Sequence, residues 1–354
     1  MTSSYNCESL IMNDDSRGIS IVSAADDKYA MPLGVTIRSA IDHLGSEQAV
    51  NIYILDGGLS RQSKARLGRS WRDPRTTITW LSPDLNQVND FRTESHLNHV
   101  TYLRLLMAEL LPSQLNRVIY LDADLLVLRS IRDMWDLELI GAPVAAVYDS
   151  FTPYLNTRET IGRPTACDRD QSTSLPIPNY RELGLAGESL YFNAGVMVVN
   201  LAAWREQRVF KSSGDLLRKH AEHARFCDQY ALNILFSQRW KSLDPRWNQN
   251  SILCHISEAN CPLPPAGLRL VRDDPWIVHF SWIEKPWHYG CKHPYVDQFF
   301  EVVDRTDWRG WRPAAPRRTL REIYSDYYSR YQRWYGRTFG RQVPKGKRRK
   351  RKAA

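Results

Sequence analysis

The chain has 354 residues, 43% of them hydrophobic and 25% charged, which is the composition of a globular protein with enough length for one large domain or two smaller ones. Its six cysteines form no Cys-x-x-Cys pair, which argues against a zinc ribbon and a dense disulfide framework and favours a reducing, cytoplasmic location. No segment has the roughly 18 consecutive apolar residues of a membrane-spanning helix, and the N-terminal residues lack the basic and apolar regions of a signal peptide.

The net charge of +9 is concentrated toward the C-terminus. Residues 309–344 contribute +7 and residues 345–352 another +7, so residues 1–308 carry −5. A mildly acidic body does not favour a nucleic-acid channel, and we expect no nucleic-acid partner.

Strand and helix patterns alternate along the chain. In chain order they predict a strand at 18–27, a helix at 29–44, a strand at 51–58, a helix at 59–71, a strand at 76–81, a helix at 100–111, a strand at 118–121, a long loop at 150–186, a strand at 191–201, helices at 202–223 and 228–238, and a strand at 276–281. This alternation predicts an α/β fold with a Rossmann-like, mostly parallel sheet that has helices on both faces.

Two carboxylates follow the buried strand at 118–121, one residue apart. Side chains at i and i+2 of an extended segment point the same way, so Asp122 and Asp124 can converge just past the strand's carboxyl end, where open α/β sheets place ligands. Paired carboxylate oxygens suit Mg²⁺ or Mn²⁺, especially beside substrate phosphates. The alternative is a pair of solvated turn aspartates that cap the next element.

Other polar residues stand at the ends of predicted strands or the starts of helices. His279 stands toward the end of the last predicted strand and would complete a mixed oxygen and nitrogen ligand set that suits Mn²⁺ better than Mg²⁺; the alternative is a buried core histidine. Lys285 and Arg104 are candidates to neutralise a diphosphate, or else ordinary surface cations.

Seven ordered blocks between about residues 18 and 300 together resemble glycosyltransferase family 8, the retaining enzymes that include bacterial lipopolysaccharide galactosyl- and glucosyltransferases and, more distantly, glycogenin. They are SAADDKYAMPLGVTIRSA, VTYLRLL, VIYLDADLLV, YFNAGVMVVNL, DQYALNILF, LDPRWNQ and HFSWIEKPWH. The resemblance implies a nucleotide-diphospho-sugar transferase fold of the GT-A type with a UDP-hexose donor.

The resemblance also implies roles for individual residues. Asp122 and Asp124 correspond to the family's D-x-D motif, which binds Mn²⁺ (or Mg²⁺) together with His279. Lys285 matches the lysine that meets the leaving diphosphate, and Ser281-Trp282 stand where a glycine is more usual. Residues that match donor-binding positions are Ala24, Asp26, Lys28 (where asparagine is commoner), Arg104, Ala123, Asn193 and Ala194. Asp228 and Gln229 match positions around the anomeric carbon, and Asp149 matches an aspartate near the sugar and acceptor.

The implied reaction retains the configuration at the anomeric carbon. Retention can come from a double displacement or from attack on the same face as the leaving group. Gln229 is a neutral amide and a poor nucleophile beside the ionised Asp228, so we favour same-face attack, with Gln229, Asp228 and Lys285 as the catalytic residues.

The predicted organisation is a disordered N-terminus at 1–17, a catalytic domain at 18–308, a basic, aromatic amphipathic helix at 309–344 and a polybasic disordered tail at 345–354. An aromatic stripe runs from Leu320 to Tyr335 at helical spacing, with arginines beside it. We expect residues 315–354 to bind an anionic membrane, placing the protein peripherally on its inner face, near a lipid-linked glycan acceptor. The alternatives are a helix packed on the catalytic domain with a solvated tail, and RNA binding by the tail.

Rival functions remain at this stage. They are a catalytically silent sugar-nucleotide or glycan-binding protein on the same fold, a nucleic-acid-binding protein built around the tail, and a glycogenin-like enzyme that glucosylates its own tyrosine. Neither the donor, glucose or galactose, nor the acceptor is specified by these patterns.

Overall fold

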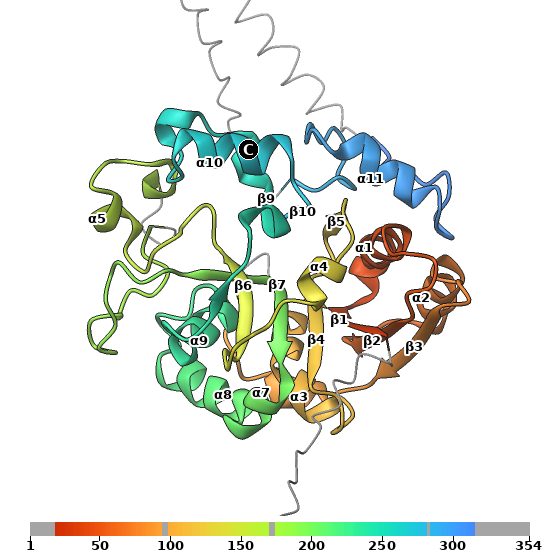
Figure 1. The fold of residues 1–354 in the computed structure, drawn as a ribbon, viewed down its shortest axis with the longest axis horizontal. Helices are drawn as coiled ribbons and strands as arrows, with labels where there is room; N and C mark the ends of the chain where they lie inside the picture. The colour runs from red at the N-terminus through yellow and green to blue at the C-terminus, as the bar shows by residue number, and fades with distance from the viewer. Residues whose placement is uncertain (1–17, 94–97, 170–173, 282–283, 316–354) are drawn as a thin grey trace, which may run out of the picture. The chain divides into compact units, whose positions relative to one another are not determined.

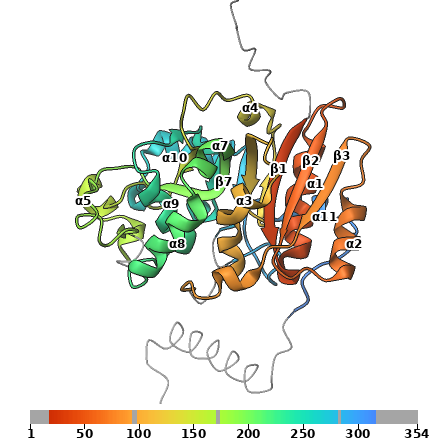
Figure 2. The ribbon, with the colours of Figure 1, turned by 90° about the horizontal axis from the view of Figure 1, so that it is seen from below.

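The computed structural model describes residues 18–93, 98–169, 174–281 and 284–315. Its centre is a seven-stranded sheet with the strand order β3-β2-β1-β4-β7-β6-β8 (Figure 1). The strands are β1 (Ile19–Ala25), β2 (Val50–Asp56), β3 (Thr76–Leu81), β4 (Arg117–Leu121), β6 (Val144–Tyr148), β7 (Phe192–Asn200) and β8 (Lys241–Ser242). Figure 2 shows β1, β2 and β3 side by side at one end of this sheet.

A second, three-stranded sheet has the order β5-β10-β9, with β5 (Leu125–Val127), β9 (Gln249–Asn250) and β10 (Ile277–His279). β5 begins four residues after β4 ends, so the D-x-D segment is the connection between the two sheets.

The large sheet is mostly parallel, as predicted, but β7 runs antiparallel to both of its neighbours, β4 and β6. Leu121 at the end of β4 is in register with Val196 in the middle of β7, so the first residues of β7 extend beyond the end of β4. The reversed direction of β7 therefore brings its first residues, Asn193 and Ala194, to the edge where the parallel strands end.

Helices cover both faces of the sheet. The α-helices are α1 (Ala30–Asp42), α2 (Arg61–Ser70), α3 (Met107–Leu110), α4 (Arg132–Trp135), α5 (Thr157–Ile161), α7 (Leu201–Glu206), α8 (Val209–Lys219), α9 (Cys227–Leu235), α10 (Pro265–Asp273) and α11 (Val296–Val303). Short 3₁₀ helices, labelled η, are η2 (Asp27–Tyr29), η3 (Leu85–Val88), η4 (His99–Leu106), η5 (Ala166–Arg169), η6 (Pro245–Asn248), η7 (Ser251–Cys254) and η8 (Glu258–Asn260).

Alternate residues of the central strands belong to two separate apolar cores. In β4, Ile119 and Leu121 pack with α1 and α11, whereas Val118 and Tyr120 pack with η4, α7 and α9. Both faces of the strand are buried, which explains why its sequence is apolar without alternation. The predicted three-layer arrangement is confirmed.

Most predicted elements are confirmed, with two corrections. The segment expected to be a long loop at 150–186 contains the short helices α5 and η5. The helix expected at 202–223 is two helices, α7 and α8, because Arg208 between them adopts a left-handed backbone conformation (φ 47°) that an α-helix cannot contain. The helix expected at 100–111 is present, but its first eight residues form a 3₁₀ helix, η4, before α3.

The compact unit that holds the sheet extends to Arg312. The ring of Trp308 packs beside Gly34 of α1 and beneath the guanidinium of Arg66 in α2. The proposed boundary at residue 308 and the helix expected at 309–344 stay predictions, since residues 316–354 lie outside the described part. Among the described helices, none is both long and apolar enough to cross a membrane.

Candidate active site

Three ligand-type side chains converge where β4, β5 and β10 meet. The His279 Nε2 atom lies 3.3 Å from Oδ1 of Asp124 and 3.8 Å from Oδ2 of Asp122. Their ligand atoms all lie within 4.8 Å of one another. Two carboxylate oxygens and one imidazole nitrogen at this spacing fit a divalent ion such as Mn²⁺. Mg²⁺, a harder Lewis acid that prefers oxygen ligands, is the alternative.

The pairing of β5 with β10 explains why residues so far apart in sequence meet here. His279 is the register partner of Leu125, which directly follows Asp124. The Phe280 amide donates to the Asp124 carbonyl at 3.0 Å, and the Asp122 amide donates to the Gly195 carbonyl at 2.8 Å. Backbone hydrogen bonds therefore fix the D-x-D segment between the last strand of the small sheet and β7 of the large one.

The Lys285 ammonium lies 2.7 Å from Oδ2 of Asp124 and also donates to the Phe280 carbonyl. Burial would raise the pKa of the Asp124 carboxyl, but the neighbouring Lys285 ammonium, with a contribution from His279, outweighs burial and holds that pKa well below its usual value. Asp124 is thereby kept as an anion, the form that binds a cation.

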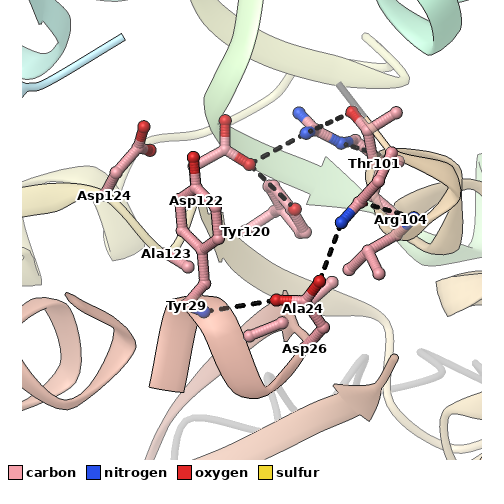
Figure 3. A pocket seen from close by; sticks show the side chains of 12 residues that line it. Ala24, Asp26, Tyr29, Thr101, Arg104, Tyr120, Asp122, Ala123 and Asp124 are labelled. Carbon is pink, nitrogen blue, oxygen red and sulfur yellow. Dashed lines mark hydrogen bonds and ion pairs between the residues drawn. The ribbon is translucent and has the colours of Figure 1, made fainter. Parts of the chain in front are cut away.

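A buried guanidinium lies between the metal-ligand cluster and α9. Arg104 pairs with Oδ1 of Asp122 at 2.9 Å and with Oδ2 of Asp228 at 3.0 Å, and it donates to the Ala194 carbonyl at 2.6 Å. Figure 3 shows it beside Tyr120, whose hydroxyl donates to the same Asp122 oxygen at 3.0 Å. Burial raises the pKa of Asp228, while Arg104 and a hydrogen bond from Thr101 act against that rise.

The start of β7 carries a further set of polar contacts. The side-chain oxygen Oε1 of Gln229 accepts the backbone amide hydrogen of Ala194 at 3.0 Å. The side-chain Nδ2 of Asn193 donates to Oδ2 of Asp149 at 2.9 Å, and Nδ2 of Asn248 donates to Oδ1 of Asn193 at 3.0 Å. The structure thus brings together Asp122, Asp124, His279, Lys285, Arg104, Asp228, Gln229, Ala194, Asn193 and Asp149 through direct contacts.

A pocket opens beside this cluster, as Figure 3 shows, and its lining includes Ala24, Asp26, Tyr29, Asn98 and Ala123. Asp26 accepts from the amides of Lys28 and Tyr29 with one oxygen and from the Asn98 side chain, at 2.8 Å, with the other. The side chain of Lys28 is exposed and does not belong to the pocket lining.

Sequence reasoning missed several residues of the site. A β-carbon on Gly195 would lie 2.4 Å from Cε1 of His279, so only glycine fits there. Asn248 contacts His279, and Thr101 contacts Asp228. All three belong to blocks that the sequence analysis had singled out, but only their contacts in space distinguish them from neighbouring residues.

Comparisons with known proteins identify a family that matches most of the chain. A model described as "Glycosyl transferase family 8" matches residues 20–291. General stress protein A of Bacillus subtilis is 31% identical over 292 residues, which are 81% of this chain and 94% of that protein. The lipopolysaccharide 1,2-glucosyltransferase of Escherichia coli is 22% identical over 316 residues, or 88% of this chain and 86% of that one.

A solved structure gives the same result for the fold. The galactosyltransferase LgtC in complex with donor and acceptor sugar analogs superposes with a TM-score of 0.67 at 25% identity, covering 82% of this chain and 99% of that one. The matched range of the family model contains every residue predicted to form the site.

Proposed function

This chain belongs to glycosyl transferase family 8, and we propose from that premise that it is a retaining hexosyltransferase that moves glucose or galactose from a UDP-sugar to a glycan or lipid-linked glycan such as lipopolysaccharide. It is a glycosyltransferase related to lipopolysaccharide glucosyl- and galactosyltransferases. The observation that carries the proposal is the cluster of Asp122, Asp124 and His279, with Lys285 bound to it, beside the pocket that contains Asp26.

Asp122, Asp124 and His279 would hold one divalent ion, preferably Mn²⁺. When bound, such an ion supplies Lewis acidity and a template for a diphosphate. Ala24, Asp26 and Ala123 line the adjoining pocket, which supports a role for them in holding the nucleoside of the donor. The exposed side chain of Lys28 lies outside that lining, so we propose that only its backbone contributes, through its hydrogen bond to Asp26.

The leaving group needs a cation and a proton acceptor. In the proposed step, the bond between the anomeric carbon and the diphosphate breaks, and its electron pair stays on the phosphate oxygen. The acceptor hydroxyl oxygen bonds to that carbon on the same face, and its proton passes to the departing phosphate oxygen. The Lys285 ammonium neutralises the charge that develops on the diphosphate.

The contacts of Asp228 support same-face attack over a double displacement. Its Oδ1 accepts from Thr101 at 2.8 Å, and its Oδ2 forms an ion pair with Arg104 at 3.0 Å but accepts no hydrogen bond from the described residues. An oxygen engaged in this way is a weak nucleophile, because attack would require it to give up a buried hydrogen bond or ion pair. We therefore propose that Asp228 and Gln229 orient the sugar through Arg104 and Ala194.

The part of the protein that binds the acceptor is proposed from the position of Asp149 at the start of a long loop. Asp149 opens the loop that continues to residue 186, and its carboxylate accepts from Asn193 of the site. We propose that this loop contacts the acceptor and that residues 315–354 bind an anionic membrane from the cytoplasmic side, which would bring a lipid-linked glycan to the pocket.

The first test is UDP release from a panel of UDP-sugars in Mn²⁺, Mg²⁺ or EDTA, for the wild type and for Asp124→Asn. We expect one UDP-hexose to be turned over in Mn²⁺, with a loss of at least about 100-fold in EDTA and in the variant. Asp304→Asn is the control, because this exposed aspartate pairs with Arg312 away from the site and its loss should leave turnover within about twofold.

The catalytically silent alternative predicts a different result. If no UDP-sugar is turned over in the presence of a glycan acceptor, while UDP binding still depends on Mn²⁺ and on Asp124, the protein is a sugar-nucleotide-binding protein and the proposed activity is wrong.

A further inference from the structure

Asn248 links the metal-ligand cluster to the opposite side of the site. It ends η6 and is only 3% exposed. Its Oδ1 lies 2.9 Å from Nδ1 of His279, and its Nδ2 lies 3.0 Å from Oδ1 of Asn193. Asn193 in turn contacts Oδ2 of Asp149 at 2.9 Å, so one chain of side chains runs from a carboxylate to the imidazole.

The donor and acceptor of each hydrogen bond in this series are determined by the groups around Asn193. The Gly195 backbone amide can only donate, and it lies 2.9 Å from Asn193 Oδ1. Oδ1 of Asp149 already accepts two backbone amides, those of Phe151 and Thr152, as expected of a carboxylate. Reversing the Asn193 amide would oppose donor to donor at Gly195 and acceptor to acceptor at Asp149.

This polarity determines the tautomer of the histidine. Since Asn193 presents an oxygen, Asn248 must present its NH₂ group to it and its own oxygen to His279. An oxygen facing Nδ1 requires that Nδ1 carries the proton. The lone pair of the neutral ring is then on Nε2, the atom that faces Asp122 and Asp124.

We propose that Asn248 is a positioning residue that holds His279 in the Nδ1–H form, so that Nε2 is available as a metal ligand. The inference rests on the proposed function only in taking the Asp122, Asp124 and His279 cluster as a metal site. Without Asn248, the neighbouring carboxylates favour the opposite tautomer, in which Nε2 carries the proton and donates a hydrogen bond to Asp124. Partners of this kind orient histidine ligands in many metal sites.

Apart from Asn248 and the two carboxylates, the contacts of His279 with the described residues do not act on its ring protons. The Ser251 hydroxyl donates to the His279 backbone carbonyl at 2.7 Å, which fixes the main chain but not the ring protons. Gly195 lies against the ring edge, but its amide donates to Asn193 and its carbonyl accepts from the Asp122 amide. Among the side-chain contacts of the described residues, Asn248 is therefore the group that selects the proton position on Nδ1.

The first experiment measures the tautomer directly, in metal-free protein. Protein labelled with ¹⁵N-histidine is studied by long-range ¹H–¹⁵N correlation at about pH 9, well above the ordinary imidazole pKa of about 6.5. His279 is assigned as the signal lost in His279→Gln. We expect a protonated Nδ1 in the wild type and a shift toward protonated Nε2 in Asn248→Leu. A wild-type ring protonated at Nε2 would overturn the proposal.

The second experiment measures Mn²⁺ affinity by electron paramagnetic resonance. We expect Asn248→Leu to raise the dissociation constant about 10- to 100-fold, and Asn248→Asp to recover part of that loss because it keeps an acceptor toward Nδ1. The matched control is Asn179→Leu, which removes an equally buried asparagine (3% exposed) that contacts the Nδ1 atom of another histidine, His220, at 3.2 Å. Its Mn²⁺ affinity should stay within twofold of the wild type.

These readouts separate the inference from the proposed function. An Asn248→Leu variant with unchanged Mn²⁺ affinity, or an Asn248→Asp variant as weak as it, overturns the positioning role even if the wild type transfers hexose. Conversely, the tautomer shift together with the loss of Mn²⁺ affinity supports the role even if no UDP-sugar is turned over, in which case only the proposed activity fails.

Discussion

The His279 ring lies directly against the backbone of Gly195, with no space between them for a side chain. A β-carbon on Gly195 would lie 2.4 Å from Cε1 of His279 and 2.8 Å from Oδ2 of Asp122. His279 and Asp122, two of the three candidate metal ligands, can therefore occupy their positions only because the β7 residue next to them is a glycine.

Gly195→Ala should displace His279 and Asp122 from each other. We expect weaker Mn²⁺ binding, loss of UDP release and a fall of about 1–3 kcal/mol in the free energy of unfolding from overpacking. Isothermal titration with Mn²⁺ and urea unfolding measure the two effects. Gly68→Ala is the control: its added β-carbon has no atom within 4 Å, and in the α2 helix it should raise stability by about 0.5–1 kcal/mol. Unchanged Mn²⁺ binding in Gly195→Ala would contradict the close contact.

Lys285→Met should destabilise the metal-free protein more than the metal-bound one. Asp124 loses its buried partner, at a cost of about 3 kcal/mol, unless a metal ion replaces the ammonium. Because the pKa of Asp124 is lowered in the folded state, this stabilisation is present at neutral pH and is lost as the pH falls below about 4.

Thermal unfolding in EDTA and in Mn²⁺ tests this expectation, and the increase in Tm on adding Mn²⁺ should be larger for Lys285→Met than for the wild type. Lys211→Met removes an exposed lysine from an aspartate pair of similar length, 2.8 Å, and should change stability by less than about 1 kcal/mol. Equal Mn²⁺-induced shifts in the Lys285 variant and the wild type would argue that the ammonium does not compensate the carboxylates.

The layered fold was predictable because buried strands and amphipathic helices have different apolar periods. Val118 to Leu121 are all apolar since the strand is buried on both faces, and this pattern can be read from the sequence alone. The antiparallel direction of β7 was not predictable, because the direction of a strand depends on how the long connection before it returns to the sheet. The break at Arg208 was also missed, since arginine does not mark a left-handed backbone position as glycine does.

The candidate site was predictable to the extent that its residues end strands. Asp122, Asp124 and His279 stand at such ends, and the strand ends meet at one edge. Asn248 could not be found in this way: its partners Asn193 and His279 are 55 and 31 residues away in the sequence, and their contacts exist only in the folded chain. The separation of Lys28 from the pocket likewise follows from side-chain direction rather than from sequence position.

Arg104→Lys should lower both activity and stability, although it keeps the charge. One ammonium cannot reproduce the forked contacts that Arg104 makes with Asp122, Asp228 and the Ala194 carbonyl. We expect a drop of at least about 100-fold in UDP release and about 3 kcal/mol in unfolding free energy. Arg269→Lys, in an exposed pair with Glu258, is the control and should behave as the wild type. A fully active Arg104→Lys enzyme would mean that charge alone is required at this position.

His293 should make the protein less stable in mild acid. It is buried beside Phe280, and burial, aided by the neighbouring His255, lowers its pKa to about 4. The folded state binds this proton less readily than the unfolded state. The contribution of His293 to the free energy of unfolding, about 1–2 kcal/mol, is therefore complete above about pH 6.5 and is lost as the pH falls toward 4. Urea unfolding between pH 7.5 and 4.5 should show a shallower pH dependence for His293→Asn, which keeps an acceptor for the Tyr295 amide. His43→Asn, at an exposed position after α1, should keep the wild-type slope, and equal slopes for all three proteins would exclude His293 as the source.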